Sequence, residues 1–470
     1  MKNGTVFYFL ATIPNLPLFD LRCISFMKDE KLLVRPISSL LVEYSLPAIF
    51  GTLMTSIYVF VDGVFIGHSV GALGLAAINI TWPIFSFSFA ISIMLAMGGA
   101  TVVSVSFGTG KYTRANRAFN NTLYAVFVIA MIFSFFSISL PEHILTMLGA
   151  NGAIMPFAKR YLVNLMYFNF FFMGTYVLDF FVRNDEHPKF AMACIVLAAV
   201  LNTLFDYFFI VRFGWGMEGA AWATGFSQLI AFSVLIFFFL SKRGKLRLSW
   251  CRFEMPLLGR IVYNGFSEFA TEMSMAIVTW IFNLVLIKSY GELGVSAFSI
   301  VTYVSLIVMM VFIGISQGLQ PIVSYNHGAG VHDRVKKALV VTLQYVFVLG
   351  LLFYALFVSF APFFIDFFIR GNKELFDLTY HAIHIFSISF MFSGLNIVMI
   401  AFLTSLERAK LSAAISLVRS LVLVLIGIMF LPMIFGNSGI WMSVPLSELG
   451  TFLIFVYLFK FSPFKKKIGF

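Results

Sequence analysis

The chain has 470 residues, of which 60% are hydrophobic and 11% are charged, and phenylalanine alone accounts for 60 of them. Because soluble domains carry about 25% charged residues, this composition excludes an ordinary soluble protein and indicates a membrane protein. The formal net charge of +11 would favour a nucleic-acid partner in a soluble protein, so its meaning depends on where the basic residues lie.

Roughly twelve stretches are long and apolar enough to cross a membrane, because a spanning helix needs about 20 predominantly apolar residues. Segments such as FSVLIFFFL lack the alternation of polar and apolar residues that is typical of membrane β-strands, so we expect an all-α fold. In chain order the predicted spans are 40–67, 73–106, 118–140, 158–182, 190–211, 218–241, 258–287, 294–325, 337–368, 377–404, 411–434 and 439–460.

The basic residues are concentrated in the N-terminal segment, in every second loop and at the C-terminus. The positive-inside rule assigns such segments to the cytoplasm. We therefore expect an even number of spans with both termini cytoplasmic, and no nucleic-acid partner. The positive net charge then reflects the orientation of the chain in the membrane rather than nucleic-acid binding.

The first 26 residues resemble a signal peptide only superficially. Their apolar run is short and interrupted by prolines, and no small-residue cleavage site follows. We expect a loose extension before Met27. The cysteines Cys23, Cys194 and Cys251 lack a CxxC or metal-binding spacing, so we expect them to be inert.

The chain repeats itself at an offset of about 220 residues. FGTGKYTRANRA, from Phe107, matches HGAGVHDRVKKA, from His327, and GALGLAA and HPKFAMA have counterparts in GELGVSA and RAKLSAA. Each half has six spans, so both halves have the same orientation in the membrane. Two such repeats with a substrate site between them are typical of transporters. The predicted parts are a cytoplasmic entry (1–39), an N-lobe (40–241), a cytoplasmic linker (242–257), a C-lobe (258–460) and a basic tail (461–470).

Polar residues fall inside several spans of the first half, where they usually face a cavity or a partner. Asn202 and Asp206 are four residues apart and therefore share one face of the fifth helix. Asp206 and Thr224 are equally far from Trp215 in the intervening loop, so they can face each other. Asp62 and Asp206 both lie about 8 to 9 Å below the outer surface, counted at 1.5 Å per residue.

We therefore expect two carboxylates, an amide and a hydroxyl to converge and bind a small hard cation, or a proton where no metal ion is present. The alternative is a structural hydrogen-bond network, or a helix cap at Asp62. The second half favours the cation site, because Phe282 and Val444 occupy the positions equivalent to Asp62 and Thr224. Structural networks tend to survive duplication, whereas this group exists in one half only.

The second half has its own acidic pair, Glu268 and Glu272, on one face of the seventh span. They could bind a cationic substrate or form a second proton site, or they could face water near the cytoplasmic end. Asp179 precedes Arg183 by four residues, so it could support the cation site or pair with that arginine.

Tyr58 stands one turn before Asp62 on the same helical face, where it could donate a hydrogen bond to the acid or only pack. We expect Asp185 and Glu186, in the turn RNDEHPK, to be solvated loop residues. We expect Glu448, near a span end, to reach the membrane surface by snorkelling.

Several segments in this order resemble the multidrug and toxic compound extrusion (MATE) family: VDGVFIG with GALGLAA, RNDEHPKFAMA, LNTLFDYFFI with GMEGAAWATGFSQ, and GISQGLQPIVSYNHGAG. The resemblance covers the chain from about Met27. It implies twelve transmembrane helices in two six-helix lobes around a central cleft, in a bacterial or archaeal plasma (inner) membrane. It also implies export of organic cations in exchange for Na⁺ or H⁺.

The resemblance is to the prokaryotic branch with an acid in the first helix, and it implies a Na⁺ or H⁺ site made by Asp62, Asn202, Asp206 and Thr224. Ala220 matches a small residue whose carbonyl can be a ligand, and Tyr58 matches a tyrosine of that branch. Glu272 resembles the seventh-helix glutamate of other branches only loosely, because its distance from Gly265 differs. Asp179 stands where an amide is expected.

The predicted function is export of amphipathic, mostly cationic drugs by a monomer surrounded by membrane lipid, in antiport with Na⁺ or H⁺ and without a cofactor. The alternative is a flippase or exporter of a lipid-linked or other amphipathic metabolite, which should show a more cationic cavity. We do not expect an enzyme, because HExxH, GxSxG and paired metal-binding histidines are missing from the sequence. We do not expect a channel, because no filter sequence is present.

Overall fold

The computed structural model describes residues 31–368 and 372–461. The predicted extension 1–26 and nearly all of the predicted tail 461–470 lie outside the described residues. All regular secondary structure within the described residues is helical.

The first lobe follows a short lead-in helix, α3 (Lys31–Val34). It comprises α4 (Ile37–Ser69), α5 (Ala72–Gly108), α6 (Tyr112–Ser139), α7 (Pro141–Met147), α8 (Met155–Met166), α9 (Asn169–Asn184), α10 (Pro188–Asp206), the π-helix η3 (Tyr207–Arg212) and α11 (Gly216–Leu240). Helices α8 and α9 meet at an angle of 52°, so the fourth predicted span is broken rather than straight.

The second lobe begins with the long helix α12 (Met255–Gly328), which is interrupted at Gly291 (φ 63°) and so provides both the seventh and the eighth predicted spans. The ninth predicted span is divided into two helices at Phe360. The remaining elements are α13 (His332–Ser359), α14 (Ala361–Phe368), α15 (Lys373–Phe386), η4 (Ser387–Ser389), α16 (Phe390–Ser405), α17 (Ala409–Leu417), the π-helix η5 (Val418–Val422), α18 (Leu423–Phe435) and α19 (Ser438–Phe461).

The predicted number of spans is confirmed in the described residues. Ten helical stretches are long and apolar enough to cross a bilayer, and the bent pair α8 and α9 makes eleven. Helix α12 counts once in that number, although its break at Gly291 divides it into two. Residues 31–368 and 372–461 therefore contain twelve helical stretches able to cross a membrane.

The two lobes repeat the same backbone irregularities. Gly71 and Gly291 both have positive φ, at 83° and 63°. Glu186 and Glu407 also share a positive φ, at 69° and 56°, which is uncommon for a residue with a side chain. A π-helix interrupts the fifth span at η3 and the eleventh at η5. The sequence repeat is therefore a repeat of the fold.

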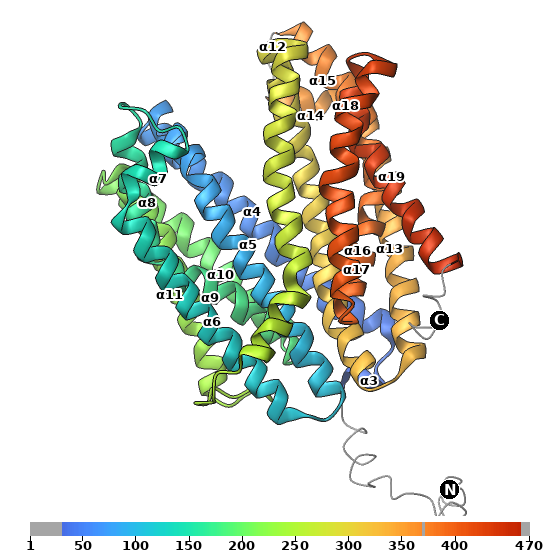
Figure 1. Ribbon diagram of the computed structural model, residues 1–470. Helices are drawn as coiled ribbons and strands as arrows, with labels where there is room; N and C mark the ends of the chain where they lie inside the picture. Colours follow the sequence, from blue (N-terminus) through green and yellow to red (C-terminus); the bar gives the residue numbers. More distant parts are fainter. Residues whose placement is uncertain (1–30, 369–371, 462–470) are drawn as a thin grey trace, which may run out of the picture.

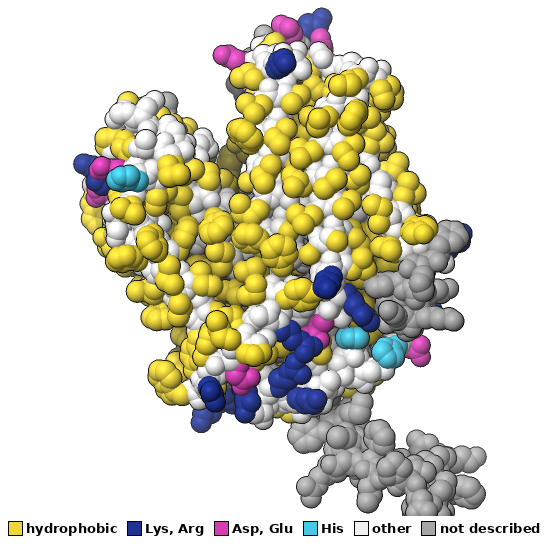
Figure 2. All heavy atoms as spheres, viewed as in Figure 1, with side chains coloured by type: hydrophobic (Ala, Val, Ile, Leu, Met, Phe, Trp, Pro, Cys, Tyr) yellow, Lys and Arg dark blue, Asp and Glu magenta, His cyan; other side chains and the backbone are white. Residues whose placement is uncertain are grey.

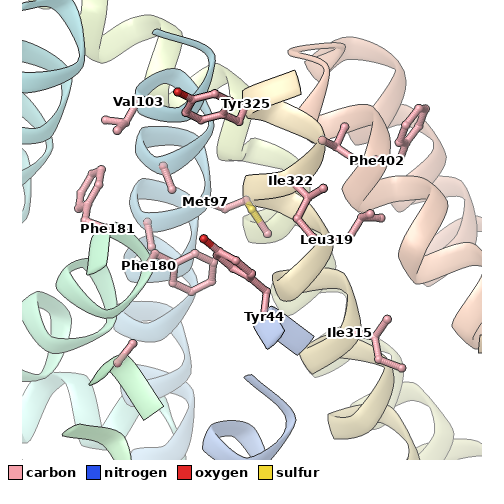
Figure 3. Close-up of a cluster of buried hydrophobic side chains, with 14 of the residues drawn as sticks. Tyr44, Met97, Val103, Phe180, Phe181, Ile315, Leu319, Ile322, Tyr325 and Phe402 are labelled. Atoms are coloured by element: carbon pink, nitrogen blue, oxygen red, sulfur yellow. The ribbon is translucent and has the colours of Figure 1, made fainter. Parts of the chain in front are cut away.

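The lobes meet where α5 crosses α12. A Cβ atom at Gly98 would lie 2.0 Å from the carbonyl oxygen of Ile261, and one at Gly265 would lie 1.8 Å from that of Met94. Small residues allow membrane helices to approach this closely. Figure 3 shows buried side chains of both lobes gathered in one cluster, including Met97 of α5 and Leu319 of α12.

The lobes separate toward the end remote from α3 (Figure 1). Figure 2 shows an open cleft between them at that end and basic side chains gathered at the other. We call these the open end and the basic end. The basic end carries the α5–α6 turn, the α9–α10 turn and the linker between α11 and α12.

Candidate functional site: a cluster of buried oxygen atoms in the first lobe

The side chains of Asn202 and Thr224 are in contact, whereas the sequence places Asp206, one turn further along α10, opposite Thr224. The Nδ2 atom of Asn202, on α10, donates a hydrogen bond to the Oγ1 atom of Thr224, on α11, at 3.2 Å. Both side chains are buried. The tight turn at Trp215 reverses the chain between these helices, which brings the two residues to the same level.

Two carboxyl groups belong to the same arrangement, one of them from a third helix. Asp62 lies two turns before the end of α4, and Asp206 is the last residue of α10 before the π-helix η3. Both are buried, with exposed fractions of 9% and 0%, and the two carboxyl groups interact electrostatically with each other. Single π-turns are frequent at functional sites, and this one begins at an acid of the cluster.

Several buried oxygen atoms of the cluster have no hydrogen-bond partner among the described residues. The Oδ1 atoms of Asp62 and Asn202 and both carboxyl oxygens of Asp206 are buried without a hydrogen-bond partner among the described residues. Buried polar atoms are ordinarily hydrogen-bonded, and these atoms are oxygens that can accept. Carboxylate and amide oxygens are ligands suited to hard cations. The cluster therefore fits a small cation, or a proton on one carboxylate, because two adjacent carboxylates cannot both stay ionised without a counter-charge.

Two predicted members of the site lie beside the cluster. Ala220 is fully buried one turn before Thr224 on α11. Tyr58 lies one turn before Asp62, and its ring is also buried. Tyr58 interacts electrostatically with Tyr176, on α9.

Sequence reasoning missed two polar neighbours. Tyr161, on α8, is buried and interacts electrostatically with both Asp62 and Asp206. Gln228 lies one turn after Thr224 on α11, and its buried Oε1 atom has no hydrogen-bond partner among the described residues. The spacing of Thr224 and Gln228 could have identified the glutamine, whereas Tyr161 is brought in only by the packing of the bent α8–α9 pair.

Asp179 forms an ion pair with Arg183, which is one of the two roles that the sequence predicts for this acid. Its Oδ2 atom lies 2.6 Å from Nη2 of Arg183, and both side chains are buried. Arg183 also donates to Oε1 of Gln317, on α12, at 2.8 Å. This pair therefore joins the lobes, while the Oδ1 atom of Asp179 keeps no partner among the described residues.

Glu268 and Glu272 lie on α12 in the second lobe, half-buried and next to each other. Glu268 interacts electrostatically with Arg419 of η5. Tyr176 of the first lobe interacts electrostatically with Glu272. The acidic pair thus belongs to the second lobe and is separate from the buried cluster of the first.

The prediction for Glu448 was wrong. It is 4% exposed and does not reach the membrane surface. Its Oε1 atom lies 2.7 Å from Nη2 of Arg419, and its Oε2 atom accepts a hydrogen bond from Asn396 at 2.6 Å. The π-helix η5, which contains Arg419, packs against α19 and makes this buried ion pair possible.

The position equivalent to Asp62 is apolar in the second lobe. Phe282 is 1% exposed and stacks on Phe298, with 4.9 Å between ring centroids. Both belong to an apolar cluster with Trp441. The buried cluster of oxygen atoms is therefore a feature of the first lobe, and the second lobe has apolar side chains at the position equivalent to Asp62.

The prediction that Asp185 is a solvated loop residue was also wrong. Its side chain is 1% exposed and accepts hydrogen bonds from the backbone N–H groups of Lys245 (2.6 Å) and Leu246 (3.2 Å). Burial raises the pKa of Asp185 to about 6, although these hydrogen bonds oppose the change. Glu186 pairs with the Lys245 ammonium at 3.0 Å, so both acids anchor the linker.

Comparison with known proteins agrees with this architecture. The MatE family model matches residues 47–208 and 269–429, which is one segment in each lobe. Because the matched segments cover more than half of the chain, the protein belongs to the MATE family.

Similar proteins include the multidrug export protein MepA of Staphylococcus saprophyticus, which is 27% identical over 305 residues, 64% of this chain and 67% of that protein. MepA of Staphylococcus aureus is 21% identical over 433 residues, 90% of this chain and 94% of that protein. The fold is similar to the outward-facing conformation of a MATE family multidrug resistance transporter, with a TM-score of 0.87 at 19% identity, covering 94% of this chain and 98% of that one.

Proposed function

We propose that this protein is a secondary active transporter that exports small organic compounds, mostly cationic and amphipathic, in exchange for Na⁺ or H⁺. Family membership and the similarity to proteins named multidrug export proteins support export of this kind. The observation that carries the ion coupling is the set of buried, unpartnered oxygen atoms of Asp62, Asn202 and Asp206.

In this proposal Asp62, Asn202, Asp206 and Thr224 bind the coupling ion, and the carbonyl group of Ala220 can add a ligand. Tyr58 and Tyr161 orient the two carboxylates from either side. Without a metal ion, one carboxylate carries a proton, so Na⁺ and H⁺ would compete for the same oxygen atoms.

We propose that the basic end faces the cytoplasm of a bacterial or archaeal cell and that both termini lie there, because loops rich in Lys and Arg stay on that side of the membrane. The described conformation is then open to the outside and closed to the cytoplasm. The Asp179–Arg183 pair and its hydrogen bond to Gln317 would be part of the closed gate, with Asp179 supporting the coupling through Tyr176.

Transport requires that ion and substrate favour different states, because a ligand shifts an equilibrium only by its differential affinity. Ion entry from outside would neutralise the carboxylates and change the packing of α4 and α10. Glu268 and Glu272 offer negative charge to a cationic substrate in the cleft, or a second proton site. One chain contains both walls of the cleft, so a monomer surrounded by lipid is the proposed unit.

The alternative, a flippase for a lipid-linked or other amphipathic metabolite, needs basic groups free to bind pyrophosphate. The two arginines of the described interior, Arg183 and Arg419, are each paired with an acid. This charge distribution favours cationic substrates over anionic ones.

Proteoliposomes containing the purified protein test the proposal. Ethidium efflux should require an inward gradient of Na⁺ or H⁺ and should stop when that gradient is collapsed. Efflux at an unchanged rate without either gradient would exclude antiport.

A further inference from the structure

An open pocket of about 760 Å³ lies at the basic end, away from the buried cluster. It is formed where the start of α6, in the first lobe, faces the start of α12, in the second. Its charged lining consists of Lys111, Arg114, Arg117, Glu254 and Arg260. Basic groups therefore outnumber acidic ones in a space large enough for a ligand.

Two of the basic residues are already paired. Arg117 lies 3.2 Å from Glu254, and Arg260 donates to Glu407 at 2.9 Å. The side chains of Lys111 and Arg114 form no hydrogen bond or ion pair with the described residues. The pocket thus has two positive charges without a counter-charge.

The N-terminus of α6 adds to this potential. Helix α6 begins at Tyr112 and has no side-chain cap. The start of α12 contributes less, because Pro256 has no N–H group and the N–H of Leu257 bonds to the carbonyl oxygen of Glu254 at 3.1 Å. The first N–H groups of a helix have no partner within the helix, and the helix dipole is positive at that end. Together with free basic side chains, the start of α6 favours an anion with several oxygen atoms.

The internal repeat shows what an arginine at this position binds. Arg334 is the counterpart of Arg114 in the second lobe. Its Nη2 atom donates to the carbonyl oxygens of Leu32 (2.9 Å) and Arg35 (2.7 Å), at the end of α3. In the second lobe the chain itself thus supplies the acceptor oxygens, whereas in the first lobe the same position opens onto the pocket.

We propose that this pocket, the Arg114 pocket, binds a phosphate group of an anionic phospholipid headgroup or of free phosphate. Lys111 and Arg114 supply the charge, and the start of α6 supplies backbone donors. The pocket lies where spans leave the membrane, and basic residues at that level attract the headgroups of an anionic membrane surface. Because α6 and α12 belong to different lobes, a bound phosphate would favour the conformation closed at the basic end.

Native mass spectrometry of the purified protein tests this assignment, with phosphatidylglycerol and phosphatidylcholine titrated in parallel. The wild type should bind phosphatidylglycerol more tightly than phosphatidylcholine. The double variant Lys111→Gln/Arg114→Gln should weaken phosphatidylglycerol binding by about tenfold. The single variant Lys111→Gln should lie between the two, and it provides the comparison if the double variant fails to fold.

Arg243→Gln is the matched control, because Arg243 is exposed in the linker outside the pocket; its binding should equal that of the wild type. Thermal unfolding measured in inorganic phosphate distinguishes free phosphate from the phospholipid headgroup as the ligand. Stabilisation of the wild type but not of the double variant assigns free phosphate, and an effect of phosphatidylglycerol alone assigns the lipid. Equal binding of phosphatidylglycerol and equal phosphate response in wild type and Lys111→Gln/Arg114→Gln would overturn the proposal.

Discussion

Asn202 donates its only described side-chain hydrogen bond to Thr224, and its amide oxygen stays buried without a partner. The Thr224 hydroxyl thus accepts the hydrogen bond of the amide nitrogen, and the amide oxygen, one helical turn before Asp206, keeps no partner among the described residues. A purely structural network would satisfy these oxygen atoms with donors, since buried polar groups are normally paired. This relationship favours the proposed ion site over a structural network.

Removal of either carboxylate charge should abolish coupling. In Asp62→Asn and in Asp206→Asn, we expect ion-driven ethidium efflux to fall by at least roughly tenfold, because an interaction with a charged group contributes about 1.5–3 kcal/mol. Proteoliposome efflux measures this. Asp333→Asn is the control, since Asp333 is exposed at the start of α13, and it should transport as the wild type does. Wild-type efflux in both site variants would exclude the proposed ion site.

Replacing the hydroxyl in the cluster should have a smaller effect. Thr224→Val preserves the shape of the side chain and copies the residue of the second lobe, Val444. It removes one oxygen ligand and leaves the Nδ2 atom of Asn202 without its acceptor. We expect the ion concentration for half-maximal efflux to rise about fivefold, from roughly 1 kcal/mol for a neutral hydrogen bond.

Thr342→Val is the matched control for that substitution. Thr342 is also fully buried, but its hydroxyl bonds only to the carbonyl group of Ala338 within α13. Its half-maximal ion concentration should not change. An equal rise in both variants would show that the effect comes from general packing rather than from ion binding.

The buried pair at the lobe contact should be sensitive to the loss of one partner. Arg183→Gln leaves the Asp179 charge buried and alone, and removing one member of a buried pair costs about 3–5 kcal/mol. We expect lower thermal stability in detergent. The double variant Asp179→Asn/Arg183→Gln should recover part of the loss, because neither charge remains. A double variant less stable than Arg183→Gln would contradict the pairing.

The linker should respond to pH through Asp185. Burial in the folded state raises the pKa of this acid to about 6 from its ordinary value of 3.8, so the folded protein binds more protons than the unfolded chain between these values. Stability therefore falls as the pH rises from about 4 to about 6, by up to roughly 3 kcal/mol. Thermal unfolding across this range should show the decrease in the wild type.

Asp185→Asn should remove this dependence, because the amide does not titrate and can still accept a hydrogen bond from the backbone of Lys245. Hydrogen exchange at the Lys245 and Leu246 amides measures the same effect locally. Parallel pH profiles for the wild type and Asp185→Asn would show that the side chain does not titrate in this range.

The sequence predicted those features of the fold that depend on one local property of the chain, such as apolar length or helical spacing. Apolar length predicted the twelve spans, and the internal repeat predicted two lobes with matching turns at Gly71 and Gly291. Asn202 and Asp206 share one face of α10, and Thr224 on α11 is as far from the turn as Asp206. This spacing predicted a polar contact between the two helices, and the described contact is the hydrogen bond from Asn202 to Thr224. Each of these follows from helix periodicity and local chain reversal.

Features that depend on packing between distant elements were not predictable in this way. The burial of Asp185 depends on the path of the linker, and the burial of Glu448 depends on the π-turn that brings in Arg419. Tyr161 reaches the acids because α8 and α9 bend by 52°. A hydropathy pattern contains no signal for these contacts.

The most direct test of the ion site is equilibrium binding of ²²Na⁺ to the purified protein, measured against pH together with proton release. The wild type should bind Na⁺ in competition with protons, or take up a proton alone if it is H⁺-coupled, and both responses should be lost in Asp62→Asn and in Asp206→Asn. Na⁺ binding or proton exchange in both variants at the wild-type level would contradict the central claim that the first-lobe oxygen cluster binds the coupling ion.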